Sequence, residues 1–407
     1  MSPVPATATG REPRVLVDDL PAEHLDELEW LWSRRQATVR SFEHFAQNLA
    51  DLDGRMAANA AGLEAVPSLA WPLLEEALGA KESSRVAAAA WTLLRMGGEA
   101  EAMAVPGPLE SGPPPAREGA RQALVRGPLG AALPGLKALA AHPDAAIAVA
   151  AAEALAAHGT APAPLALAGW LSSADADVRL AACRVAAWAE VAADKLEPLA
   201  RGDAEEAVRF AAYEAGVWMR APWALALGRE RAKAKDESNT RQLALFCALA
   251  GKADAPLVAA LGAHAPLGPV RFAMLAACGN FASMEACLAG MAAKDAKDAE
   301  AAGAAFLRLT GFGAGPAKRV ALPPPADAGP DAAEFADEAF VPDPAHAQRQ
   351  WEERKEEFAK GGRWARGLDA DGAGVAAELD LGSRFETMMR ARFKGGGSGG
   401  RRELLQV

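Results

Sequence analysis

Aromatic side chains are scarce in this sequence. They make up 6 % of its 407 residues, and Tyr213 is the one tyrosine. Strand-rich folds depend on β-branched and aromatic residues. Here the apolar fraction of 51 % consists in large part of alanine, which has the highest helix propensity. The composition therefore predicts an all-α protein in which helices pack on helices.

Cysteine is also rare, and no two cysteines form a Cys-x-x-Cys pair. Each cysteine lies in an apolar, helix-like stretch, which indicates a small buried hydrophobic side chain rather than a zinc ligand or a redox pair. The histidines do not share a helix face at ligand spacing. The residues considered are Cys183, Cys247, Cys278, Cys287, His24, His44, His142, His158, His264 and His346. We therefore expect no catalytic residue, cofactor or metal site, and no enzymatic activity.

Long apolar runs and a positive charge balance are missing too. The longest apolar candidate, Ala145 to Ala157, is mostly alanine and contains Glu153, so no membrane-spanning helix is predicted. The opening MSPVPATATGREPR has no apolar core of a secretory signal. A net charge of −10 argues against a protein that grips phosphate backbones. We expect a cytoplasmic location, no membrane insertion and no nucleic-acid partner.

An internal repeat is the strongest positive feature. Eight alanine-rich amphipathic segments each follow an acidic, polar or proline-bearing start and often end in glycine. Their equivalent positions lie 30–32 residues apart, at Val86, Arg117, Ile147, Val178, Val208, Thr240, Val270 and Ala302. This period holds two short helices and two turns. One such hairpin cannot bury its own apolar face, whereas stacked hairpins can.

Val-Arg followed by small apolar residues recurs at Val178, Val208 and Val270. With an acidic residue just before, this pattern resembles HEAT-like repeats of the short bacterial type, over roughly Val66 to Thr310. The resemblance implies a right-handed α-solenoid of helical hairpins, with an N-terminal helical cap and a small C-terminal module.

The residues before the repeats show a second pattern. Two amphipathic helices are predicted, Pro21–Ala37 and Ser41–Ala61. The second contains Leu49, Leu52, Asp53, Arg55, Met56 and Ala58, and Gly62 and Leu63 follow it directly. This spacing resembles the start of an uncharacterised proteobacterial family, numerous in myxobacteria, whose C-terminal region is similar to Gly362-Arg363-Trp364. Members commonly have histidine or aspartate near Asn59 and Ala61, where this chain departs. Some members are encoded near type VI secretion genes, which implies an accessory or adaptor role.

Changes in composition divide the chain into six predicted parts. They are a disordered start over residues 1–14, a helical cap over 15–65, the repeat solenoid over 66–311, a linker rich in Pro, Gly and Asp over 312–343, a helical module over 344–394 and a flexible tail over 395–407. Within the module, helices are predicted from Pro344 to Lys360 and from Ser383 onward.

Two sets of residues at equivalent repeat positions are the candidate functional residues. Arg179, Arg209 and Arg271 would form a column when the hairpins stack. This column is either a structural ladder that pairs with acids such as Asp177 and Glu206, or a basic strip that faces a ligand. Trp188 and Trp218 also share a register, and either fill the core or form a contact surface, where tryptophan is enriched.

Three weaker patterns have ordinary structural explanations. Gly396 to Gly400 satisfies Gly-x-Ser-x-Gly but lies in a glycine spacer rather than a strand–turn–helix. The stretch with Asp369, Asp371, Gly374 and Asp380 has part of a calcium-loop pattern but lacks its final glutamate. Gly311 to Gly315 could form an anion-binding nest, yet a helix end followed by a loop explains it.

These observations favour a non-catalytic scaffold or adaptor that binds another protein, and the family resemblance implies that it is an accessory to a type VI secretion-type system. An immunity or chaperone protein for a secreted effector is an alternative, because it differs only in its partner. A HEAT-like DNA-repair glycosylase or a lyase is a further alternative. The acidic balance argues against the glycosylase, which needs a basic concave face.

Overall fold

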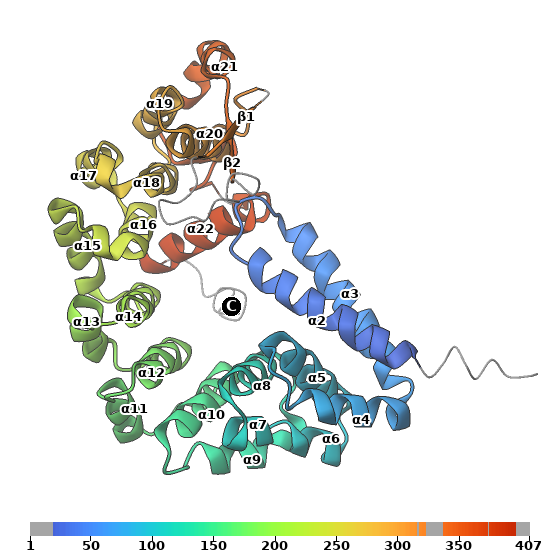
Figure 1. Cartoon of the computed structure of the whole chain (residues 1–407). Helices are drawn as coiled ribbons and strands as arrows, with labels where there is room; N and C mark the ends of the chain where they lie inside the picture. The colour runs from blue at the N-terminus through green and yellow to red at the C-terminus, as the bar shows by residue number, and fades with distance from the viewer. Residues whose placement is uncertain (1–18, 316, 323–336, 373, 396–407) are drawn as a thin grey trace, which may run out of the picture. The chain divides into compact units, whose positions relative to one another are not determined.

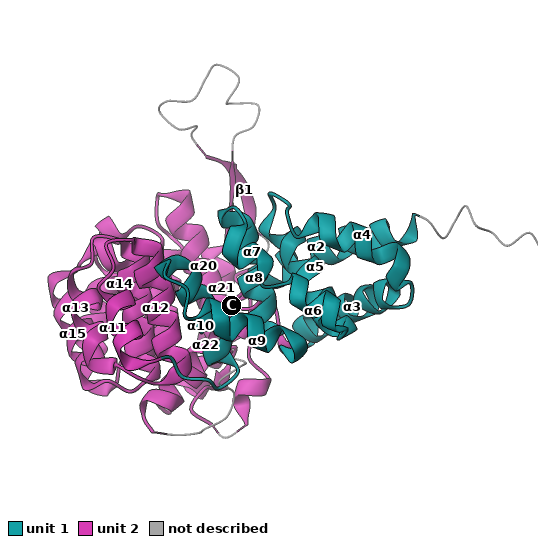
Figure 2. Ribbon diagram, turned by 90° about the horizontal axis from the view of Figure 1, so that it is seen from below, with its two compact units in different colours: residues 1–38, 47–162, 406 teal, residues 39–46, 163–405, 407 magenta. Residues whose placement is uncertain are grey.

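The chain is mostly helical, and helices that follow one another in sequence pack against one another in space. The computed structural model describes residues 19–315, 317–322, 337–372 and 374–395. Among them, residues 19–38 and 47–162 form one compact unit, called unit 1, and residues 39–46 and 163–395 form a second, called unit 2 (Figure 2). The predicted start over 1–14, the Gly-x-Ser-x-Gly stretch and the tail after Gly395 lie outside the described residues.

Unit 1 is built only of helices among its described residues. Helix α2 packs on α4 and α5, α5 packs on α8, and α8 packs on α10. Asp144 begins α10 as an N-cap, since its carboxylate accepts the Ala146 N–H. The helices are α2 (Leu20–Thr38), α3 (Ala46–Glu64), α4 (Pro67–Ala77), α5 (Ser83–Met96), α6 (Glu99–Ala104), α7 (Gly107–Ser111), α8 (Pro114–Arg126), η1 (Gly130–Ala132), α9 (Leu133–Leu139) and α10 (Ala145–Ala157).

Unit 2 arranges five helical hairpins in two layers. Figure 1 shows the first helix of each hairpin along one side and the second helix along the other. The first layer contains α11 (Pro164–Leu171), α13 (Ala193–Gly202), α15 (Pro222–Ala234), α17 (Ala255–Gly262) and α19 (Phe281–Gly290). The second layer contains α12 (Ala176–Ala189), α14 (Glu206–Trp218), α16 (Thr240–Leu249), α18 (Val270–Cys278) and α20 (Ala296–Thr310). Short turns η2 (Glu237–Asn239), η3 (Lys252–Asp254) and η4 (Ala265–Leu267) join some of them.

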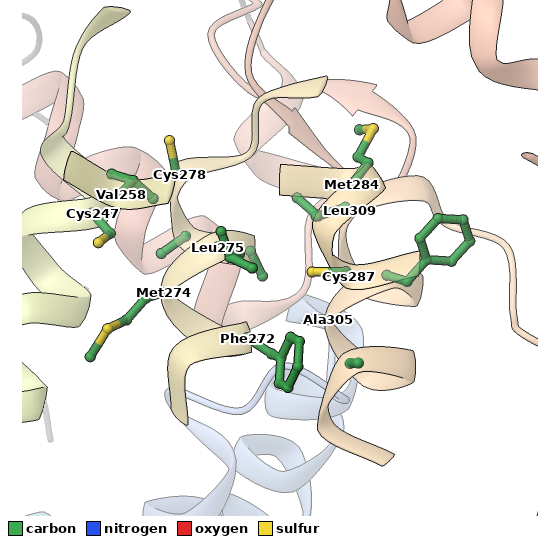
Figure 3. Close-up of a cluster of buried hydrophobic side chains, with 14 of the residues drawn as sticks. Cys247, Val258, Phe272, Met274, Leu275, Cys278, Met284, Cys287, Ala305 and Leu309 are labelled. Carbon is green, nitrogen blue, oxygen red and sulfur yellow. The ribbon is translucent and has the colours of Figure 1, made fainter. Parts of the chain in front are cut away.

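A continuous apolar cluster lies between these layers from the end of α15 onward, and part of it is drawn in Figure 3. Phe246 and Phe306 are fully buried in it, and each such side chain contributes about 1.5–3 kcal/mol through the hydrophobic effect. Helix α21 (Pro344–Phe358) closes this cluster with Trp351 and Phe358, whose rings stack at a centroid distance of 5.7 Å. Helix α21 therefore shares the core of the hairpins that precede it.

The remaining segments of unit 2 correct part of the predicted linker. Strands β1 (Lys318–Ala321) and β2 (Glu338–Val341) form an antiparallel ribbon in which Arg319 lies opposite Phe340. Composition alone missed this ribbon, because two four-residue strands give too short an alternation to stand out among Gly, Pro and Asp. Further along are strands β3 (Trp364–Ala365) and β4 (Leu368–Asp369), which also pair, then η6 (Val375–Ala377) and α22 (Leu381–Phe393).

A second correction concerns the start of α3. The predicted helix from Ser41 begins only at Ala46. The Ser41 hydroxyl accepts the Glu43 N–H at 3.1 Å and lies 2.9 Å from His44 Nδ1. Such side-chain bonds compete with a helix and favour a turn. None of the described helices is long and apolar enough to cross a membrane.

Candidate interaction surface

The arginines at equivalent repeat positions bind the neighbouring hairpin in unit 2. Arg179, near the start of α12, donates two hydrogen bonds to Asp203, at 2.7 and 2.8 Å. It also donates to the carbonyl oxygens of Ser173 and Ala174, at 2.9 Å each. Because Asp203 lies in the turn between α13 and α14, one guanidinium joins two consecutive hairpins. The hydrogen bond from Arg179 lowers the pKa of Asp203, although burial works in the opposite direction.

The other two arginines repeat this arrangement with different partners. Arg209 donates to Asn239 Oδ1 at 2.8 Å and to the carbonyl of Asp203 at 2.8 Å. Arg271 donates to both carboxylate oxygens of Asp298, at 3.1 and 2.7 Å. Each partner lies at or near the start of the next helix of the same layer. The column thus forms contacts between hairpins, with partners other than the predicted Asp177 and Glu206, while a role in binding a ligand stays a prediction.

Both register tryptophans are buried. Trp188 is 3 % exposed and Trp218 is 2 % exposed. The guanidinium of Arg392, from α22, lies 4.8 Å from the centroid of the Trp218 ring. The indole nitrogen of Trp218 has no hydrogen-bond partner among the described residues. In this structure neither ring is available on the surface of unit 2, so a direct contact of these rings with a partner stays a prediction that would require α22 to move.

Two equivalent grooves lie between consecutive helices of the first layer. The groove between α11 and α13 has a volume of about 450 Å³, and the one between α17 and α19 has about 410 Å³. Small residues such as Ala168 and Ala286 line them. Arg179 borders the first and Arg271 the second. Two of the three column arginines therefore line these grooves, while their guanidinium groups bind the next hairpin.

The segment after α21 inserts a buried arginine between two hairpins. Arg363, 9 % exposed, donates to the carbonyl oxygens of Ala248 at 2.6 Å and Ala277 at 2.8 Å. It also donates to the carbonyls of Cys247, at 3.3 Å, and Ala250. These carbonyls end α16 and α18, where a helix has no partners of its own for them. Burial and the nearby charge of Arg390 lower the pKa of Arg363.

A second buried charge cluster surrounds α22. Arg308 of α20 pairs with Glu386 and donates to the hydroxyl of Ser383 at 3.2 Å. Arg390, 2 % exposed, binds Asp371 at 2.7 Å and the carbonyl of Ala248 at 3.3 Å. Burial raises the pKa of Glu386 despite the charge of Arg308. The Arg308–Glu386 pair is the buried one, with side chains 8 % and 15 % exposed, and removing either partner of such a pair leaves an uncompensated buried charge.

In unit 1, the motif that carries the family resemblance forms the contact between α2 and α3. Asp53 accepts hydrogen bonds from Arg35 at 2.7 Å and from Arg126 at 2.5 Å. Burial opposes ionisation of Asp53, but the charges of Arg126 and Arg35 outweigh it and lower its pKa. A Cβ atom at Gly62 would lie 2.5 Å from His24 Nε2, so a larger residue would displace the His24 ring from its present position.

The weaker sequence patterns have structural roles here. Asp369 accepts the Asp371 N–H at 3.2 Å, Asp371 is paired with Arg390, and Asp380 accepts the Ser383 N–H as the N-cap of α22. All three carboxylates of the partial calcium pattern are therefore engaged. Gly311 caps α20 with a φ of 77°. Among the described residues, no group of three or more His, Cys, Asp and Glu side chains is placed to hold a metal ion.

The sequence indicated some of these residues but not their roles. Arg363 falls in the Gly-Arg-Trp stretch of the family resemblance, whereas Arg308, Glu386 and Arg390 lacked any signal in repeat register. Their one sequence feature is charge within otherwise apolar helix faces, which indicates a buried pair. No protein-family model matches the chain, and no curated protein matches it.

Proposed function

We propose that the chain is a non-catalytic, protein-binding scaffold or adaptor built as a right-handed α-solenoid of HEAT-like hairpins. The observation that supports this most is the arginine column of unit 2. Arginines at one repeat position fasten three of the four junctions between the five hairpins of unit 2, through Asp203, Asn239 and Asp298. An array held in this way offers an extended surface, which suits the binding of another macromolecule.

The charge balance supports a protein partner rather than a nucleic acid. The net charge is −10, and the ladder arginines already have partners within the protein. An accessory role in a type VI secretion-type system rests on the family resemblance of the N-terminal motif. Identifying the partner tests this role, because the partner should then be a component of such a system.

Affinity capture of the tagged full chain from its own cells, at low salt, followed by mass spectrometry, tests the scaffold. We expect one or two stoichiometric proteins, each of which forms a complex of defined mass with the purified chain by light scattering. A matched capture with Leu243→Asp, which puts a charge into the core of unit 2, removes proteins that bind unfolded chains. If no captured protein re-forms a complex with the purified chain, the scaffold proposal is wrong.

A further inference from the structure

Residues Val39–Ala46 lie between α2 and α3 in sequence, yet they are part of unit 2, where they lie against the start of α22. The Leu381 N–H donates to the carbonyl of His44 at 2.8 Å, and the Gly382 N–H donates to the carbonyl of Ser41 at 2.9 Å. Both donors belong to the first turn of α22, where backbone N–H groups have no partner within the helix. The segment is thus held through its backbone, as a bound peptide is.

Phe42, the first aromatic residue of this segment, packs closely against α20 and α22. The guanidinium of Arg308 lies 3.7 Å from the centroid of the Phe42 ring, within range of a cation–π interaction. On α22, a Cβ atom at Gly382 would lie 2.3 Å from Phe42 Cδ1, so the ring needs glycine at this position. Ser383 and Glu386 also hold Arg308, through a hydrogen bond and an ion pair that do not involve the segment. The position for Phe42 is therefore preformed by α20 and α22.

A second arginine holds the other end of the segment. Arg366 donates to the carbonyl of Phe42, and its guanidinium lies 5.6 Å from the centroid of the Phe45 ring. Asp380, which is fully buried, accepts a hydrogen bond from Arg366 at 3.0 Å and forms a backbone bridge with Phe45. Arg366 has a φ of 54°, a costly conformation for a residue with a side chain. Its N–H is fixed by the Arg308 carbonyl at 2.7 Å, so the surrounding backbone maintains this conformation.

A basic residue precedes the two aromatic ones. Arg40 lies 2.8 Å from Glu214 of α14, and its guanidinium stacks 4.0 Å from the centroid of the Phe385 ring. The recognised sequence is therefore Arg-x-Phe-x-x-Phe, at Arg40, Phe42 and Phe45. The side chains that receive it come from α14, α20, α22 and the Arg366 turn.

The two phenylalanines of the segment are only partly covered. Phe42 is 37 % exposed and Phe45 is 40 % exposed, whereas the residues that receive them, Arg308 and Asp380, are buried at 6 % and 0 %. A segment with half-exposed anchors opens at a lower free energy than the core beneath it. Its release would leave a rigid, preformed site.

We propose that this is a peptide-binding site, occupied here by the chain's own residues 39–46, whose external ligand is an extended Arg-x-Phe-x-x-Phe segment of a partner protein. The proposal specifies the partner of the scaffold and rests on that function only in requiring a protein ligand. The internal segment competes with the external one, so the apparent affinity of the intact chain is reduced by the small fraction of open sites.

Fluorescence anisotropy with a labelled peptide of residues 39–46 tests the site on the full chain. The variant Phe42→Ala/Phe45→Ala is expected to bind this peptide at least tenfold more tightly than the unaltered chain, because its internal competitor is weakened. Phe340→Ala, which removes a ring exposed to 51 % on β2, is the matched control and should behave like the unaltered chain. A peptide with alanine at both phenylalanine positions should not bind.

Adding Gly382→Ala to the double variant places a methyl group where the incoming ring must lie, and binding should be lost. Circular dichroism and the melting temperature establish that each variant is folded, and Phe42→Ala alone replaces the double variant if that one unfolds. A folded variant that binds no tighter than the unaltered chain, or that still binds after Gly382→Ala, overturns the site. A concentration-dependent dimer of the unaltered chain would identify a second copy as the occupant and overturn the partner-protein ligand. If a stoichiometric partner is captured but no variant binds the peptide, the scaffold proposal stands and the peptide-binding site is wrong.

Discussion

Asp53 shows how one carboxylate can hold three helices of unit 1. It accepts hydrogen bonds from Arg35 on α2 and Arg126 on α8, while it belongs to α3 itself. Trp32 and Trp91 flank the pair, with Arg126 lying 5.6 and 5.9 Å from their ring centroids. Burial and the charge of Arg35 lower the pKa of Arg126 to about 10, because two arginines share one acid. Removing that acid leaves both arginines uncompensated.

Asp53→Asn is therefore expected to destabilise unit 1 by about 1 kcal/mol at pH 7, a value for charged hydrogen bonds reduced for partial exposure. Because the folded pKa of Asp53 lies below its usual 3.8, its contribution is complete above pH 3.8 and disappears as the pH falls through the folded value. Urea unfolding at pH 7 and pH 3 should show the difference between the two proteins shrinking. Asp51→Asn, an exposed neighbour that binds Gln47, should have no such effect, and an equal loss at both pH values would contradict this account.

Burial also controls the reactivity of the four cysteine thiols. All four are buried, and burial raises the pKa of Cys183 and of Cys287 to about 12. At pH 8 such a thiol has a thiolate fraction about a thousandfold smaller than one with a pKa of 9. We expect Ellman's reagent to label the folded chain at least a hundredfold more slowly than the chain in 6 M guanidinium. Rapid labelling of one thiol in the folded chain would show that its helix opens locally.

At the scale of the element, the sequence predicted the helices of the repeat closely. The eight repeat segments correspond to α5, α8, α10, α12, α14, α16, α18 and α20. This worked because capping residues such as Asp175 and terminal glycines such as Gly97 are local signals that lie next to the helix they bound. The ribbon of β1 and β2 and the extended stretch before α3 could not be predicted, because both depend on partners far away in the sequence, Glu300 and α22 respectively.

The site residues divide in the same way. Arg179, Arg209 and Arg271 were found because each recurs at one position of the repeat, although their partners were not. Arg308 and Arg366 recur nowhere, so no periodicity marks them. Their roles follow from the fold that brings residue 42 beside residue 382. Sequence periodicity therefore identifies residues that have the same role in several hairpins. It misses residues whose role occurs once, such as Arg308 and Arg366.

Because the arginine column joins neighbouring hairpins, we expect its arginines to stabilise unit 2. Arg179→Ala should lower the free energy of unfolding by about 1.5–3 kcal/mol, because it breaks a bidentate hydrogen bond to Asp203, whose side chain is 4 % exposed. Arg201→Ala, which breaks surface pairs with Glu197 and Glu230, should cost less than about 1 kcal/mol. Urea unfolding of both variants gives the comparison. A loss of partner binding in Arg179→Ala without a loss of stability would instead favour the ligand-facing role.

At the scale of the whole molecule, residues remote in sequence connect the C-terminal segment of unit 2 to its hairpins. The hairpins from α11 to α20 follow one another locally, but Arg363 reaches back 116 residues to Cys247 and 86 residues to Ala277. The Trp364 N–H donates to the carbonyl of Gly279 at 2.7 Å. A Cβ atom at Gly279 would lie 2.8 Å from the Trp364 carbonyl oxygen, so this position in the turn after α18 requires glycine. The C-terminal segment thus restrains the spacing of α16 and α18.

Replacing Arg363 by methionine tests this restraint. The change keeps a long apolar side chain but removes the guanidinium that donates to four backbone carbonyl oxygens, of which that of Ala248 also accepts from Arg390. Each costs about 1–3 kcal/mol, so we expect a total loss of at least about 3 kcal/mol. Hydrogen exchange should show the amides near the ends of α16 and α18 losing protection first, since only these helices lose hydrogen bonds. Arg349→Met, an exposed arginine on α21, should leave exchange unchanged. If Arg363→Met left exchange in α16 and α18 unaltered, the hairpins would keep their spacing without the C-terminal segment, and its role would be limited to presenting α22 to residues 39–46.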